Sequence, residues 1–255
     1  MHVFRLKGDF ETLDAYTPLL FDLGARGLEE KPGEVWAYFP ARLELPLPGE
    51  WAELADTDWL EAWQRDLKPV KAGPFVVLAP WHDWEGPERR ILLEPGMAFG
   101  TGHHETTRMA LEAVAEHVRP GKGLRALDLG TGSGILAIAA QMLGAQAVGI
   151  DNDAAVIPQA AENAAANGVN PEFYVGTLED AQGSFDLIVA NLYAELHARL
   201  APEYPKYLVP GGLMLMTGIL SERESLVDQA MRSSGFEPLH RRQEGEWIHL
   251  TYRKP

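Results

Sequence analysis

The chain has 255 residues, of which 46% are hydrophobic and 23% charged, a composition that is ordinary for a globular protein and excludes collagen-like or largely disordered chains. Its 22 Lys and Arg residues stand against 37 Asp and Glu residues, so the net charge is -15. This negative charge argues against a protein that binds the phosphate backbone of a nucleic acid, and it favours a basic partner.

Cysteine is absent from the sequence, which excludes disulfides, thiol nucleophiles and cysteine-ligated metal sites and is typical of a reducing compartment. No segment approaches the roughly 18 consecutive apolar residues of a membrane span. The amino-terminal residues lack the apolar stretch of an export signal. We therefore expect a cytoplasmic protein with no membrane partner.

Residues 1–54 are expected to form a small α+β domain. Val3–Leu6 alternates like a short strand, and Phe10–Leu23 has apolar residues at helical spacing. A hairpin is predicted around the turn Lys31-Pro32-Gly33-Glu34. With five basic and ten acidic residues in this range, the domain is expected to dock a protein substrate and not to read a nucleic acid.

Residues 55–68 are expected to form a short helix that links two domains. Asp56 or Thr57 can cap its start, acidic residues occupy its first turn, and Pro69 follows its end.

From residue 69 onward, short apolar strands alternate with helices, which is typical of a parallel sheet covered on both faces. The expected strands of this sheet are Arg125–Leu129, Ala147–Ile150, Pro171–Val175, Phe185–Ala190 and Leu213–Thr217. Two earlier strands are predicted near Phe75–Ala79 and Arg90–Glu94, and a helix after Thr106. The last segments, Phe236–Gln243 and Trp247–Arg253, flank a Glu-Gly-Glu turn and predict an antiparallel hairpin at the edge of the sheet. The fold class is therefore α/β.

The segment richest in chemical information is Asp128-Leu129-Gly130-Thr131-Gly132-Ser133-Gly134. Its glycines allow a tight turn and close approach of a ligand, and the helix that follows offers unpaired N–H groups, so a nucleotide-type cofactor is implied. A dinucleotide fingerprint would need glycine where Ile135 stands. The Asp128 carboxylate would repel a pyrophosphate but suits a positively charged amino-acid group.

Asp151 ends the next predicted strand. A carboxylate at this position can accept both hydroxyls of a ribose. The alternative is that Asp151 only caps the helix that follows.

The Asp128–Gly134 segment followed by Asp151 resembles the class I S-adenosylmethionine-dependent methyltransferases, and the terminal hairpin is also typical of that fold. Two further stretches narrow the resemblance: Glu94–Thr107, which contains Pro-Gly-Met-Ala-Phe-Gly-Thr-Gly-His-His, and Ala190-Asn191-Leu192-Tyr193. Over its whole length, the chain is similar to the bacterial ribosomal protein L11 methyltransferases, the PrmA family. The resemblance implies a Rossmann-like methyltransferase domain over residues 69–255.

The resemblance also implies a cofactor, S-adenosylmethionine, and a set of residues that bind it. The implied cofactor-binding residues are Thr107, Gly130, Thr131, Gly132, Asp151, Leu178 and Asn191. Asp128 is added for the amino-acid group of the cofactor. Phe99 is added because an aromatic ring can face a cation in the methyl-transfer pocket, and Trp247 is considered for the same place, although a core role is open for both rings.

The family methylates Lys side chains and an N-terminal amine of a ribosomal protein at the base of the large-subunit stalk, adding up to three methyl groups. The resemblance therefore implies a protein N-methyltransferase whose partner is this basic protein, either free or on the ribosome. We expect the enzyme to act as a monomer and without direct nucleic-acid readout.

Asn191 is the candidate catalytic residue. The nucleophile must be a neutral amine, yet an unperturbed Lys has a pKa near ~10.4. A dry pocket beside a sulfonium disfavours the ammonium form. An amide oxygen can then accept an amine N–H and orient the lone pair, whereas a carboxylate would favour the ammonium. This scheme requires no general base.

His103-His104-Glu105 invites a metal interpretation, but adjacent histidines point apart and no third ligand has a recognisable spacing. We expect no metal site, and interpret the segment as a loop that caps the helix beginning near Thr106 or as a flap over the cofactor.

Three other functions stay open from the residues alone. A methyltransferase acting on RNA or DNA would share the cofactor site, although the charge of -15 counts against it. A nicotinamide-dependent dehydrogenase is disfavoured by Ile135. A non-enzymatic ribosome-binding adaptor would not need to bind a cofactor.

Overall fold

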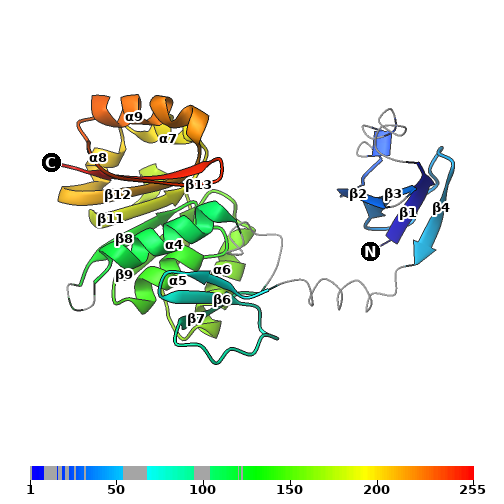
Figure 1. Ribbon diagram of the computed structural model, residues 1–255, viewed down its shortest axis with the longest axis horizontal. Coiled ribbons are helices and arrows are strands. Elements are labelled where there is room, and N and C mark those ends of the chain that lie inside the picture. Colours follow the sequence, from blue (N-terminus) through cyan, green and yellow to red (C-terminus); the bar gives the residue numbers. More distant parts are fainter. Residues whose placement is uncertain are drawn as a thin grey trace. The chain divides into compact units, whose positions relative to one another are not determined.

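The computed structural model describes residues 2–8, 16, 19–20, 23–25, 27–31, 33–53, 68–94, 104–119, 121 and 123–255. The chain divides into two compact units, Met1–Lys68 and Pro69–Pro255, which are labelled by element in Figure 1. Phe99, His103, most of the expected helix over Phe10–Leu23, and all of the expected linker helix except Lys68 lie outside the described residues.

The amino-terminal unit contains a four-stranded sheet in the order β2-β3-β1-β4, in which every neighbouring pair is antiparallel. Its strands are β1 (His2–Lys7), β2 (Gly27–Lys31), β3 (Glu34–Phe39) and β4 (Gly49–Glu53). The predicted hairpin is confirmed, since Lys31 and Glu34 are partners at its turn. The Trp51 ring of β4 meets Phe4 and Phe39 edge-on, at centroid distances of 5.2 and 5.4 Å, and so closes the small core.

The carboxy-terminal unit is built on a seven-stranded sheet in the order β10-β9-β8-β11-β12-β14-β13. The first five strands are mutually parallel, and β14 pairs antiparallel with both β12 and β13, so the sheet ends in the antiparallel hairpin that the sequence predicts. The strands are β8 (Arg125–Leu129), β9 (Gln146–Asp151), β10 (Glu172–Val175), β11 (Phe185–Asn191), β12 (Leu208–Leu220), β13 (Glu237–Glu244) and β14 (Trp247–Arg253). β12 starts earlier than the predicted Leu213 because Leu208, which precedes Gly211 and Gly212, already pairs with Phe185 of β11.

The two earlier strands form a separate three-stranded sheet. It consists of β5 (Val70–Ala72), β6 (Phe75–Leu78) and β7 (Arg89–Leu92), with β5 antiparallel and β7 parallel to β6.

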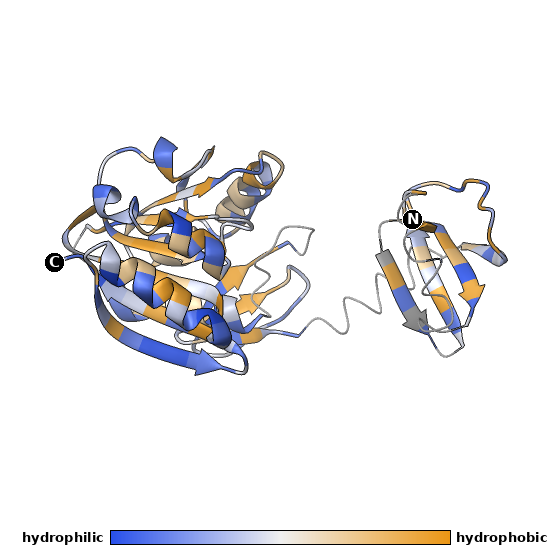
Figure 2. Ribbon diagram, turned by 90° about the horizontal axis from the view of Figure 1, so that it is seen from above, coloured by the Kyte–Doolittle hydropathy of each residue, from blue (hydrophilic) through white to orange (hydrophobic). Residues whose placement is uncertain are grey.

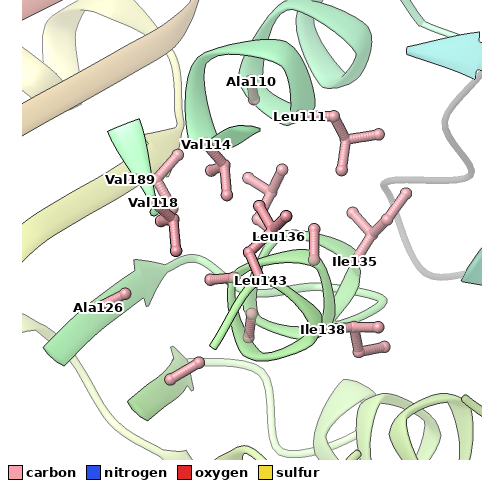
Figure 3. Close-up of a cluster of buried hydrophobic side chains, with 14 of the residues drawn as sticks. Ala110, Leu111, Val114, Val118, Ala126, Ile135, Leu136, Ile138, Leu143 and Val189 are labelled. Atoms are coloured by element: carbon pink, nitrogen blue, oxygen red, sulfur yellow. The ribbon is translucent and has the colours of Figure 1, made fainter. Parts of the chain in front are cut away.

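Helices cover both faces of the large sheet (Figure 1). They are α4 (Glu105–His117), α5 (Ile135–Met142), α6 (Val156–Ala166), α7 (Ala194–Leu200), α8 (Tyr204–Tyr207) and α9 (Glu224–Ser233). Alternation along β8 divides the core, since Ala126 packs with α4 and α5 while Leu127 packs with α7 to α9. Figure 3 shows the first of these clusters, in which Val114 of α4 and Leu136 of α5 lie close together. Within the described part of the chain, no helix has the length and apolar character needed to cross a membrane.

The edge strand β13 is strongly polar (Figure 2). It contains Pro238, and its Arg241 binds Glu224 of α9 through a 2.8 Å ion pair. Arg242 pairs with Glu112 of α4. Charges and proline on an edge strand hinder pairing with further strands.

Candidate active site

The turn after β8 needs its glycines. Gly130, Gly132 and Gly134 have φ values of 75°, 51° and 83°, a region that side chains with a Cβ rarely adopt. A Cβ on Gly130 would also lie 2.7 Å from Leu192 Cδ2, and one on Gly134 would lie 3.1 Å from Ala160 Cβ. The glycines therefore bring β8, α6 and the end of β11 close together.

Asp128 holds this turn through hydrogen bonds to residues in the turn and in α5. Its side chain is buried, and Oδ2 accepts hydrogen bonds from Thr131 Oγ1 at 2.7 Å and from the Ala137 N–H at 3.0 Å. Oδ1 has no hydrogen-bond partner among the residues that the structure describes. Burial raises the pKa of the Asp128 carboxyl to about 7. These contacts tie the glycine turn to the first turns of α5.

Asp151 ties the same turn to β9. Its Oδ2 accepts the Gly132 N–H at 2.9 Å, and its Oδ1 accepts the Asp153 N–H at 3.0 Å. Each oxygen retains a further lone pair for a hydroxyl donor. The alternative role as a helix cap is wrong, because α6 begins only at Val156 and its N-cap is Ala155.

A cavity of about 570 Å³ opens at the carboxyl ends of these strands. This volume is in the range of small-molecule sites, and the carboxyl ends of parallel strands are where α/β sheets bind ligands. Of the predicted residues, Gly130, Asp151 and Leu178 line the cavity. Leu178 sits on a 3₁₀ turn (Leu178–Asp180), which is held by a capping box between Thr177 and Asp180. Thr107, Thr131, Gly132, Asp128 and Asn191 are not among the described lining residues.

Asn191 lies at the end of β11, where it meets the start of α4. Its Nδ2 donates to Thr106 Oγ1 at 3.2 Å and lies 3.5 Å from Thr107 Oγ1. Both threonines are only 1% exposed, whereas Asn191 is half-buried. Because the amide nitrogen faces the two hydroxyls, the amide oxygen is the end of Asn191 that is left to accept a hydrogen bond.

Comparison with known proteins identifies the family. The model of the family described as "Ribosomal protein L11 methyltransferase (PrmA)" matches residues 40–255. The chain belongs to the ribosomal protein L11 methyltransferase family. Its relative of that name from Thermus thermophilus is 62% identical over 254 residues, which is 99% of each chain. The Deinococcus radiodurans relative is 45% identical and covers 100% of this chain and 99% of its own.

A solved structure agrees with this membership. The "ribosomal protein L11 methylase" of Lactobacillus delbrueckii subsp. bulgaricus is 33% identical, superimposes with a TM-score of 0.69, and covers 74% of this chain and 100% of its own. The resemblance recognised in the sequence and the class I methyltransferase fold are both confirmed. The chain is thus an enzyme of the L11 methyltransferase family.

In this L11 methyltransferase family member, β12 passes very close to Asn191. Gly218 has a φ of 80°, and a Cβ there would lie 2.8 Å from Asn191 Oδ1 and 2.6 Å from the Leu192 carbonyl oxygen. Next to it, the Thr217 carbonyl oxygen accepts the Leu192 N–H at 3.0 Å and lies 3.0 Å from His197 Nε2. Burial lowers the pKa of His197 to about 4, so this ring is neutral and its Nε2 donates to the carbonyl.

His104 is the N-cap of α4, because its Nδ1 accepts the Thr106 N–H at 3.3 Å. The interpretation of this segment as a helix cap is therefore confirmed for His104. Within the described residues, no three His, Cys, Asp or Glu side chains are grouped in a way that could hold a metal ion.

Sequence reasoning missed the wall of the cavity that α7 and the residues flanking it supply. Leu192, Leu196 and Leu200 line the cavity together with Arg199 and Glu203. Leucines at spacings of four residues directly after Asn191 mark one face of a helix. That periodicity, combined with the position of α7 after β11, is the signal that could have found them.

Proposed function

We propose that this chain transfers methyl groups from S-adenosylmethionine to amines of ribosomal protein L11. Membership of the family supports the reaction class and the partner. The observation that carries the proposal is the arrangement of Asn191, whose amide nitrogen is engaged by two buried threonine hydroxyls and whose oxygen is left to accept.

The cavity fits a nucleoside cofactor. Asp151 supplies a carboxylate with lone pairs for the two ribose hydroxyls. Gly130 has no side chain, so the cavity wall next to Leu192 stays open. Leu178 offers an apolar contact for the adenine. The full set of proposed cofactor-binding residues is Thr107, Asp128, Gly130, Thr131, Gly132, Asp151, Leu178, Asn191 and Phe99, and Asp128 also holds the turn. When bound, the cofactor supplies a methyl group on an electrophilic sulfonium.

The residues of the chain then act by orientation and by exclusion of water. The incoming amine must be neutral, and transfer from water into a low-dielectric site lowers the pKa of a lysine. Asn191 Oδ1 accepts one amine N–H and directs the nitrogen lone pair without fixing a charge. Most of the rate enhancement is expected from this alignment of the reacting atoms.

Lys side chains and the N-terminal amine of L11, as part of the stalk base, are the proposed acceptors, with up to three methyl groups on each. A single neutral hydrogen-bond acceptor supports repeated transfer, because the amine can rotate between rounds without breaking an ion pair. We also assign the enzyme to the cytoplasm, as a monomer that reads no nucleic acid and binds no membrane.

The amino-terminal unit is the proposed docking site for L11. Residues 1–54 carry five basic and ten acidic residues, which suits a basic partner. An open groove of about 860 Å³ runs between Phe4, Trp51 and the segment Arg42–Leu47. Its mixed apolar and polar lining is of the kind that holds a protein segment.

Intact-mass measurement of L11 after incubation with enzyme and S-adenosylmethionine tests the proposal. We expect increments of about 14 Da, one for each methyl group that replaces a hydrogen. Unmodified L11, under conditions where calorimetry shows that the cofactor binds, would refute the substrate. Absence of cofactor binding in calorimetry would instead favour an adaptor, and salt-sensitive RNA capture on filters would favour a nucleic-acid methyltransferase.

A further inference from the structure

His104 is connected to Asn191 through Thr106. The ring Nδ1 of His104 lies 2.8 Å from Thr106 Oγ1, in addition to the backbone N–H that it accepts from the same residue. Thr106 Oγ1 in turn lies 3.2 Å from Asn191 Nδ2. The three side chains thus form a continuous hydrogen-bonded line from the cap of α4 to the end of β11.

The directions of these hydrogen bonds follow from the cap. A ring nitrogen that accepts a backbone N–H carries a lone pair and no hydrogen, so the Thr106 hydroxyl must donate to that nitrogen. The hydroxyl hydrogen is then used, and only lone pairs of Thr106 Oγ1 face Asn191. An amide oxygen would find no donor at Thr106 Oγ1, whereas an amide NH₂ group finds an acceptor there.

We propose that His104 is a positioning residue that sets which end of the Asn191 amide faces the incoming amine. If the Thr106 hydroxyl were free to rotate, it could donate to the amide oxygen, and the Asn191 amide could flip by 180°. The NH₂ group would then face the amine and compete for its lone pair, which is the wrong interaction for a nucleophile. This inference rests on the proposed role of Asn191.

The carboxy-terminal hairpin holds His104 in place. The His104 ring meets the ring of Trp247 edge-on, with centroids 4.9 Å apart. Arg108, one turn further along α4, forms a 2.9 Å ion pair with Glu244 on the other strand of that hairpin. Trp247, considered from the sequence as a pocket aromatic, is therefore placed here as a support for His104.

Two capping variants separate positioning from helix stability. Ser and Asn are both good N-caps, so His104→Ser and His104→Asn should unfold at about the temperature of the parent enzyme. The Asn oxygen accepts the cap N–H and can accept the Thr106 hydroxyl as well, which keeps its hydrogen pointed away from Asn191. The Ser hydroxyl can donate as readily as accept, so it leaves the direction of the Thr106 hydroxyl undetermined.

We expect His104→Ser to lower kcat for L11 methylation about tenfold, as for the loss of one hydrogen bond in the transition state. His104→Asn should restore most of the rate, and the calorimetric Kd for S-adenosylmethionine should change little in either variant. Thr106→Val should lose about as much as His104→Ser, and the double variant should lose no more than Thr106→Val alone. His82→Ala is the matched control, because His82 Nδ1 also accepts a backbone N–H, from Ala79, in a loop outside the site.

Full kcat in His104→Ser, or losses that multiply in the double variant, would overturn the inference. A loss of kcat in His104→Ser and His104→Asn alike, with unchanged stability, would also overturn it. If Asn191→Ala keeps full kcat, the role of Asn191 itself is refuted. If Asn191→Ala is impaired while His104→Ser is not, only the role of His104 fails.

Discussion

The backbone N–H of Gly132 donates to Asp151 Oδ2 across 2.9 Å and thereby joins the ends of β8 and β9. The same carboxylate faces the cavity. Asp151→Ala should therefore weaken S-adenosylmethionine binding in two ways, by removing acceptors for the ribose hydroxyls and by releasing the turn. We expect the calorimetric Kd to rise roughly tenfold to a hundredfold. Asp153→Ala, which removes only an exposed contact to the Ala155 N–H, should leave Kd unchanged.

Asn191→Ala should lower kcat by about a hundredfold with a much smaller effect on KM for L11, since the lost interaction orients the reacting amine. Asn191→Asp should not rescue the rate near neutral pH, because a carboxylate stabilises the ammonium form of the substrate. Its activity should rise more steeply with pH than that of the parent enzyme. Steady-state rates across a pH series measure both effects, and an unchanged kcat in either variant would remove Asn191 from the mechanism.

Gly218→Ala should damage both stability and catalysis. The new Cβ would meet the Leu192 carbonyl oxygen at 2.6 Å and Asn191 Oδ1 at 2.8 Å, at a φ of 80°. Gly211→Ala on the same strand has a similar φ of 78°, but among the described residues beyond its chain neighbours no atom lies within 4 Å of the new Cβ. Both variants should lose about 1 kcal/mol from backbone strain, but only Gly218→Ala should also lose kcat. Equal kcat values for the two variants would contradict this.

Stability should fall in mildly acidic solution because of His197. Its folded-state pKa is lowered from 6.5 to about 4, so the unfolded chain binds the proton more readily. The neutral, buried His197 contributes roughly 3 kcal/mol to the free energy of unfolding. This contribution is fully present above pH 6.5 and is lost as the pH falls through about 4. Buried His249, with a pKa lowered to about 3, acts in the same direction. Urea unfolding of His197→Gln should show a weaker dependence on pH between 6.5 and 4 than the parent enzyme.

Removal of residues 1–54 should preserve cofactor binding and abolish methylation of L11. The carboxy-terminal unit, Pro69–Pro255, has its own large core, so the truncated enzyme should give a calorimetric Kd for S-adenosylmethionine close to that of the full chain. Undiminished turnover of L11 by the truncated enzyme would show that docking does not need the amino-terminal unit.

The sequence predictions that the structure confirms depend on patterns of residues that are close together in the chain. The glycine turn, the parallel strands and the terminal hairpin each follow from residues that are adjacent in the chain. β4 was not predicted, because Gly49–Glu53 has too few apolar residues to show a pattern, and only its pairing with β1 makes it a strand. The early start of β12 at Leu208 likewise depends on pairing, since two glycines interrupt the apolar run.

In the candidate site, too, some residues could be predicted from the local sequence and others depend on contacts between distant segments. Gly130 directly follows a predicted strand and Asp151 ends the next one, so both could be placed at the cavity from the strand pattern, whereas Leu178 was implied by the family resemblance. The meeting of Thr106 with Asn191 could not be foreseen, because 85 positions separate them in the sequence and the contact depends on how α4 packs against β11. Asp128 also depends on packing: it turns inward beneath the loop toward Ala137 and is 2% exposed.

The polar strand β13 has a consequence for the behaviour of the enzyme at high concentration. An edge strand normally has unpaired backbone N–H and C=O groups that can pair with a strand of another molecule. Pro238 has no backbone N–H to offer, and Arg241 and Arg242 form ion pairs with Glu224 of α9 and Glu112 of α4, so charged side chains flank the strand. We therefore expect little strand pairing between molecules at β13. The enzyme should stay free of fibres built through this edge when it is concentrated.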